Sequence, residues 1–127
     1  MSSRLIDTAI LVDLLRGNTF TQSWLDEQPQ GAVVISVVTV AELLAGCRNQ
    51  NEQKAVENEL VLYPVLWLTE SISQLAIRWY SQYHLSHGVG FFDCLIGATA
   101  SQNNLELCTF NEKHFRPFTE LRLLRPH

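Results

Sequence analysis

Cysteine is scarce in this sequence, and no hydrophobic run is long. The three cysteines, Cys47, Cys94 and Cys108, form no C-x-x-C pair, so neither a zinc site nor a disulfide framework is indicated. No apolar run reaches the roughly 18 residues that a membrane span needs. The N-terminus has no apolar segment followed by a cleavage site. We therefore expect no signal peptide, no membrane association and a cytoplasmic location.

Charged residues are also sparse, at 17% of 127 residues, whereas hydrophobic residues make up 46%. This composition predicts one ordered globular domain over residues 1–127. The net charge of −4 excludes a broadly basic nucleic-acid-binding protein. Four basic residues nevertheless collect near the C-terminus, against the single acid Glu120: Lys113, Arg116, Arg122 and Arg125. They form either a local positive strip or a solvated tail.

Short apolar runs alternate with helical patterns along the chain. Strands are predicted at residues 3–6, 32–36, 65–68 and 106–109, with a last edge strand at 121–124. Helices are predicted at residues 8–16, 19–28, 37–46, 51–62 and 91–100, and in a long stretch that Thr69 caps. Residues 110–118 read as a loop or short turn. This alternation predicts an α/β fold, a three-layer α/β/α sandwich around a mostly parallel sheet.

The stretch from Phe91 to Ala100 predicts a buried helix with a single charged residue, Asp93. One face of this helix is expected to be buried, with apolar or small residues at i, i+3, i+4 and i+7: Phe92, Leu95, Ile96 and Thr99. The face of Asp93 also carries Gly97, and its small residues let another element pack closely. A buried carboxylate rarely stays ionised without a partner. We therefore expect another group to pair with Asp93.

Polar residues from distant segments should meet at one edge of the predicted sheet. Asp7 ends the first strand, Glu42 lies in the second turn of the helix after the second strand, and Asp93 begins its own helix. Thr109 and Asn111 follow the fourth strand. Sites in open parallel sheets lie outside the carboxyl ends of the strands. These five residues therefore form the candidate site.

Each acid also has a structural interpretation. Asp7 and Asp93 could cap the helices that they begin, and Thr39-x-x-Glu42 fits a capping box. Together, however, three carboxylates at about 5 Å from one another would repel by roughly 3 kcal/mol per pair at an effective dielectric constant near 20. A divalent cation is the simplest group that removes this repulsion.

The candidate ligands are all oxygen atoms, which favours Mg²⁺, with Mn²⁺ as a substitute, over zinc. Because magnesium keeps several water molecules, we expect Asp7 and Asp93 to be direct ligands and Glu42 to act through water. Asn111 would fill a neutral or water-mediated position. A magnesium ion at a cleft mouth suits the chemistry of phosphoryl groups.

Four segments, in order, resemble the motifs of PIN-domain ribonucleases, and in particular VapC-type toxins of bacterial type II toxin–antitoxin pairs. They are residues 5–8 (Leu-Ile-Asp-Thr) with 14–17 (Leu-Leu-Arg-Gly), residues 36–46 (Ser-Val-Val-Thr-Val-Ala-Glu-Leu-Leu-Ala-Gly), residues 92–100 and residues 109–115 (Thr-Phe-Asn-Glu-Lys-His-Phe). The resemblance covers essentially the whole chain. One departure is Asn111, where many PIN domains carry a fourth acid, and it leaves open whether one or two metal ions bind.

The resemblance implies Mg²⁺-dependent endonucleolytic cleavage of RNA by metal-activated water, leaving a 5′-phosphate and a 3′-hydroxyl. Thr8 and Thr109 would orient the metal ligands, and Lys113, Arg116 and Arg16 are candidate contacts to the RNA backbone. The resemblance also implies a VapB-like antitoxin that blocks the site. We expect a toxin homodimer that forms a heterotetramer or a larger assembly with the antitoxin.

Other functions remain open from the residues alone. A non-catalytic PIN-like module would bind RNA or protein and use the acids only structurally. A phosphoacceptor receiver domain would need paired acids after the first strand, where only Asp7 is present. The pair His84-x-x-His87 is a weak metal signal, because isolated histidines near a helix end are usually solvated or capping.

Overall fold

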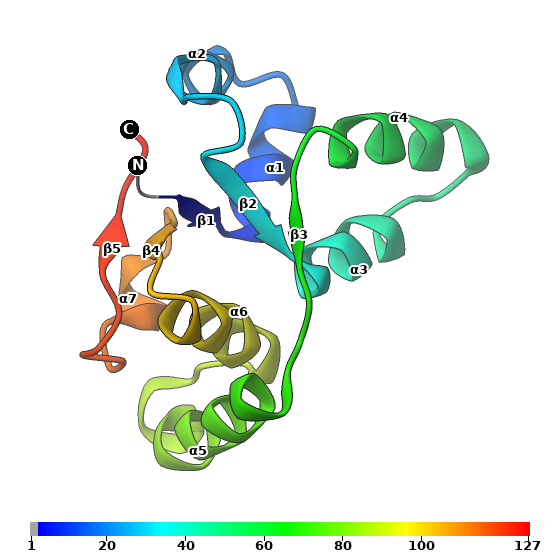
Figure 1. The fold of residues 1–127 in the computed structure, drawn as a ribbon. Coiled ribbons are helices and arrows are strands. Elements are labelled where there is room, and N and C mark those ends of the chain that lie inside the picture. The colour runs from blue at the N-terminus through cyan, green and yellow to red at the C-terminus, as the bar shows by residue number, and fades with distance from the viewer. Residues whose placement is uncertain (1–2) are drawn as a thin grey trace.

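The computed structural model describes residues 3–127 and contains one five-stranded parallel sheet (Figure 1). The strand order is β3–β2–β1–β4–β5, and every pairing between neighbours is parallel. The strands are β1 (Arg4–Ile6), β2 (Val33–Ser36), β3 (Val65–Leu66), β4 (Glu106–Cys108) and β5 (Leu123–Leu124). The predicted parallel sheet, including its C-terminal edge strand, is confirmed.

Helices cover both faces of the sheet, which confirms the three-layer α/β/α sandwich (Figure 1). They are α1 (Thr8–Leu15), α2 (Thr19–Glu27), α3 (Val37–Ala45), α4 (Gln50–Leu60), α5 (Glu70–His87), α6 (Phe91–Gln102) and α7 (Glu112–Phe115). Helices α1, α2 and α4 pack on one face, and α5, α6 and α7 pack on the other. Over the described residues, no helix combines the length and hydrophobicity that crossing a membrane requires.

Alternate residues of each strand enter different cores, because side chains along a strand point to opposite faces. In β1, Leu5 belongs to the cluster under α5 and α6, whereas Ile6 belongs to the cluster under α1 and α4. In β4, Leu107 and Cys108 divide in the same way. The continuous apolar runs in the sequence therefore reflect burial on both faces, as parallel sheets require.

The small face of α6 packs closely on its neighbours, as predicted. A methyl group added at Gly97 would lie 3.2 Å from Leu121 Cδ1 and 3.4 Å from Trp79 Cζ3. The neighbouring face, which was expected to be buried, differs from the prediction at Phe92, whose exposed fraction is 56%, although Leu95 is buried. Phe92 lies in the first turn of α6, before the helix enters the core. Periodicity therefore predicted correctly that Phe92 shares a helix face with Leu95, but wrongly that Phe92 is buried.

One further prediction is wrong in detail: the third strand ends at Leu66, and the predicted strand residues Trp67 and Leu68 are exposed. Residues 110–118, predicted as a loop or short turn, contain the four-residue helix α7. Thr69 does cap α5, since its hydroxyl accepts a hydrogen bond from the Ile72 N–H at 3.2 Å.

Candidate active site

Asp7 is the buried centre of the candidate site, with an exposed fraction of 5%. It follows β1 and caps α1: its Oδ1 accepts a hydrogen bond from the Thr8 N–H at 2.8 Å. Its Oδ2 accepts a second bond from the Thr109 hydroxyl at 2.9 Å. The capping interpretation is therefore correct for Asp7, and both of its carboxylate oxygens accept a hydrogen bond.

Thr109 stands beside Asp7 because β1 and β4 are adjacent parallel strands in register, with Ile6 opposite Cys108. The Asp7 N–H donates to the Cys108 carbonyl at 2.9 Å, which holds the two strand ends together. The Thr109 hydroxyl also accepts a hydrogen bond from the Asn111 N–H at 2.9 Å. One buried hydroxyl thus connects the first acid to the loop after β4.

Glu42 approaches the site from α3 and does not form the predicted capping box. The cap of α3 is Ser36, whose hydroxyl accepts from the Val38 N–H at 3.0 Å. The Glu42 Oε1 instead accepts a hydrogen bond from the Thr8 hydroxyl at 2.7 Å. The Thr8 hydroxyl also lies 2.8 Å from the hydroxyl of Thr39, a buried residue that sequence reasoning did not assign to the site. The i, i+3 spacing of Thr39 and Glu42 places them on one helix face and could have indicated this contact.

Asp93 lies in the first turn of α6 and is half-buried. The residue before α6, Gly90, makes no side-chain cap, and Asp93 pairs instead with His114 of α7. The distance from His114 Nδ1 to Asp93 Oδ2 is 3.5 Å. Sequence reasoning gave His114 no role, although its place directly after β4 puts it at the same edge of the sheet.

Burial raises the pKa of two acids of this site, Asp7 and Asp93. Burial raises the pKa of Asp7 from its usual 3.8 to about 6, and the negative charges of Asp93 and Glu42 add to the rise, while the bond from Thr109 opposes it. Burial also raises the pKa of Asp93, and contact with His114 opposes that rise. Within residues 3–127, no lysine or arginine forms an ion pair with any of the three acids.

Oxygen donors of this kind suit a hard divalent cation, because Asp93 and Glu42 lie near enough to raise the pKa of Asp7 and no lysine or arginine neutralises the three acids in the described residues. Over the described part of the chain, no three histidine, cysteine, aspartate or glutamate side chains form a ready-made cluster for a metal ion. The metal ligands therefore stay a prediction. The negative charge of Asp93 raises the pKa of Asp7 more than that of Glu42 does, so Asp7 and Asp93 are the pair that we expect to hold the ion.

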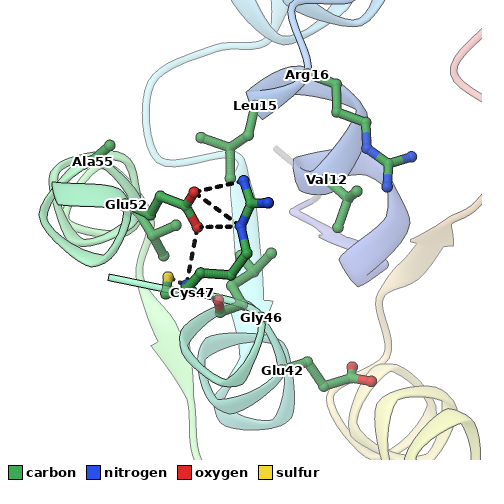
Figure 2. Close-up of a pocket in the computed structure, with 11 residues that line it drawn as sticks. Val12, Leu15, Arg16, Glu42, Gly46, Cys47, Glu52 and Ala55 are labelled. Carbon is green, nitrogen blue, oxygen red and sulfur yellow. Dashed lines mark hydrogen bonds and ion pairs between the residues drawn. The ribbon is translucent and has the colours of Figure 1, made fainter. Parts of the chain in front are cut away.

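The remaining predicted residues lie in two different hollows. Asn111, Lys113 and Arg116 line a hollow of about 330 Å³ that also includes His114. Arg16 instead lines a larger hollow of about 580 Å³ between α1, α3 and α4 (Figure 2). The structure thus separates Arg16 from the other two proposed RNA contacts.

The larger hollow adjoins the site through Glu42. Figure 2 shows Glu52 near one end of the hollow and Glu42 at the other end. Arg48 Nη2 lies 2.8 Å from Glu52 Oε2 at the rim, and the floor is largely apolar. The apolar lining residues are Val12, Leu15, Leu43, Ala55 and Val56. No pattern in the sequence indicated this hollow, because its walls come from three helices.

Comparison with known proteins places this geometry in a family. The family model of the PIN domain matches residues 4–119. The chain is 37% identical over 120 residues to Ribonuclease VapC10 of Mycobacterium tuberculosis, covering 93% of this chain and 90% of that protein. A toxin–antitoxin complex from Klebsiella pneumoniae has a chain with a TM-score of 0.82 and 25% identity, covering 98% of both chains. VapBC-1 from nontypeable Haemophilus influenzae has a TM-score of 0.80 and 25% identity, covering 97% of both. The chain therefore belongs to the PIN-domain family, among its members of the VapC type.

Proposed function

We propose that this chain is a metal-dependent endoribonuclease and the toxin of a toxin–antitoxin pair. The observation that carries the proposal is the buried Asp7 carboxylate. Two hydrogen bonds hold it, and its pKa is raised chiefly by burial and further by the charges of Asp93 and Glu42. A protein 37% identical to this chain is named a ribonuclease, and solved relatives are toxin–antitoxin complexes. These names support RNA as substrate and an antitoxin as partner.

In this proposal Asp7 and Asp93 hold Mg²⁺ directly, and Glu42 acts through a water molecule. The bound ion would neutralise phosphate oxygens and lower the pKa of a water molecule that attacks the phosphodiester. Thr109 and Thr8 keep the carboxylates of Asp7 and Glu42 in fixed orientations, which is the usual role of hydrogen bonds around metal ligands.

The central test is cleavage of RNA by variants that lose one carboxylate each. Asp7→Asn and Asp93→Asn should reduce cleavage in Mg²⁺ or Mn²⁺ to background while circular dichroism shows an unchanged fold. Asp26→Asn removes an exposed acid on α2 and should cleave normally. Full activity of either site variant would contradict the proposal. Mn²⁺ titration distinguishes the proposed enzyme from a non-catalytic binding module. Only the enzyme should have an Mn²⁺ affinity that Asp93→Asn removes.

We further propose that an antitoxin segment occupies the hollow of Figure 2. Its apolar floor suits the hydrophobic side of a peptide, and its end at Glu42 would let the bound segment block access to the acids. Leu15→Asp, at the hollow, should weaken binding of the antitoxin, as measured by calorimetry, without changing RNA cleavage. Leu85→Asp on the exposed side of α5 should change neither. Equal antitoxin affinity of the two variants would place the antitoxin elsewhere.

A second copy of this chain is the proposed occupant of another hollow, of about 410 Å³ and almost entirely apolar. Phe92 and Leu68 form part of its wall and are exposed at 56% and 39%. Glu42 also lines it, so the hollow is continuous with the candidate site. A homodimer that buries this surface would bring two sites near one interface.

A further inference from the structure

The hollow behind His114 is continuous with the acids of the site. His114 lines this hollow and also contacts Asp93, with 3.5 Å between Nδ1 and Oδ2. Asn111, whose N–H bonds the Thr109 hydroxyl that holds Asp7, lines it as well. A ligand that extends from the acids along β4 and α7 would therefore enter this hollow.

Arg125 is held in the hollow in a fixed position. Its Nη1 donates to the Phe110 carbonyl at 3.0 Å, and its Nε donates to the His127 carbonyl at 3.0 Å. Its Cζ lies 5.5 Å from the centre of the Phe110 ring, within cation–π range. A guanidinium carries five N–H donors, so three remain available. Because the group is already ordered, an anion that binds there loses little conformational freedom.

The charge of the hollow is opposite to that of the molecule as a whole. The protein has a net charge of −4, yet the hollow gathers Lys113, Arg116 and Arg125 against one acid, Glu112. Over residues 3–127, none of these three cations forms an ion pair with an aspartate or glutamate side chain. A cluster of cations that no acidic side chain neutralises attracts an anion, even beside an acidic site.

We propose that this hollow binds a phosphate group of the RNA strand next to the phosphate that is cleaved, with Arg125 as its main contact. The inference rests on the proposed function, since RNA supplies the anion. A polyanion that approaches three carboxylates needs a nearby positive surface. The hollow is a local surface, which suits a flexible single strand or loop better than a long duplex. An acidic segment of the antitoxin is the other anion that the hollow could take, and the experiment separates the two.

The test compares two arginines of the same C-terminal region. Arg125→Gln removes the charge in the hollow, whereas Arg122→Gln removes an arginine that bonds the Asn104 carbonyl and does not line the hollow. Fluorescence anisotropy measures the affinity for a short single-stranded oligoribonucleotide of mixed sequence, with Ca²⁺ in place of Mg²⁺ and increasing KCl. Arg125→Gln should weaken binding about five- to tenfold at low salt and reduce the salt slope by about 0.7. Arg122→Gln should change neither.

A third variant should change the RNA affinity in the opposite direction. Glu112→Gln removes the one acidic side chain among the described residues that line the hollow, and it should tighten RNA binding. Equal affinities for the Arg125 and Arg122 variants, or no RNA binding by the wild type at low salt, would overturn the inference. Loss of antitoxin affinity in Arg125→Gln with unchanged RNA affinity would overturn it in favour of a peptide.

Kinetics distinguish failure of the inference from failure of the proposed function. With Mg²⁺, Arg125→Gln should raise KM for RNA and leave kcat nearly unchanged, because the residue does not touch the acids. Cleavage by the wild type with identical KM in both arginine variants would leave the nuclease proposal standing and remove the phosphate site. If RNA binding depends on Arg125 but the wild type cleaves no RNA, the phosphate site stands and the nuclease proposal is wrong.

Discussion

Replacing Asp7 by asparagine should make the metal-free protein more stable near neutral pH, although the same change abolishes the proposed activity. Asp7 is buried, and its pKa rises from 3.8 to about 6, chiefly through burial and then through the charges of Asp93 and Glu42. A carboxyl group whose pKa is raised by folding contributes stability while it is protonated. That contribution is complete below 3.8 and is lost as the pH rises through about 6.

The size of the effect follows from the pKa. A rise from 3.8 to about 6 corresponds to about 3 kcal/mol of lost stability at a pH well above 6. Asparagine has one acceptor oxygen, whereas the carboxylate accepts from both the Thr8 N–H and the Thr109 hydroxyl. Loss of one such bond costs about 1 kcal/mol. The variant should therefore gain about 2 kcal/mol over the wild type in alkaline buffer and lose about 1 kcal/mol in acid.

Urea unfolding in EDTA over a range of pH measures this difference. Asp26→Asn removes a negative charge from an exposed position and should stay within about 0.5 kcal/mol of the wild type throughout. Adding Mg²⁺ should make the wild type more stable than Asp7→Asn. An ion that binds only the folded wild type adds about 2.7 kcal/mol to its stability at a concentration 100-fold above the Kd. The asparagine variant should not respond to Mg²⁺ in this way.

Two results would contradict this prediction. If Asp7→Asn is less stable than the wild type in alkaline EDTA buffer, burial and the neighbouring charges do not destabilise the ionised carboxylate of Asp7. The site would then need no cation to neutralise it. If both proteins gain equally from Mg²⁺, the ion binds elsewhere, and the metal part of the proposal is wrong.

Two further predictions concern the support of the site and the dimer. Thr109→Val removes a hydrogen bond that lowers the pKa of Asp7, so the acid limb of the pH–activity profile should move to higher pH. Thr99→Val, which removes an equally buried hydroxyl bonded only within α6, should leave that limb unchanged, and an unmoved limb in both variants would refute the role of Thr109. Phe92→Asp should convert the proposed dimer to a monomer in light scattering, whereas Ile77→Asp, at a residue of similar exposure, should not. A monomeric wild type would exclude this dimer.

The sequence by itself determined the sheet and the edge at which the acids meet. Continuous apolar runs such as residues 32–36 indicated strands buried on both faces, and the alternation with helices required parallel connections. Once the strands are parallel, Asp7 and Thr109 must lie at the same edge, because each follows the carboxyl end of its strand. The placement of these residues thus depends on chain direction alone.

Only the tertiary structure decided which side chains touch one another and which hydrophobic surfaces stay open. The contact of His114 with Asp93 and the fixing of Arg125 over Phe110 depend on how α7 and β5 pack, and no local pattern encodes that packing. Phe92 carries the helical period of a core residue, yet 56% of its surface stays exposed. Periodicity reports the face on which a residue lies. What covers that face is set by strand order, helix packing and side-chain rotamers, which segments distant in sequence determine together.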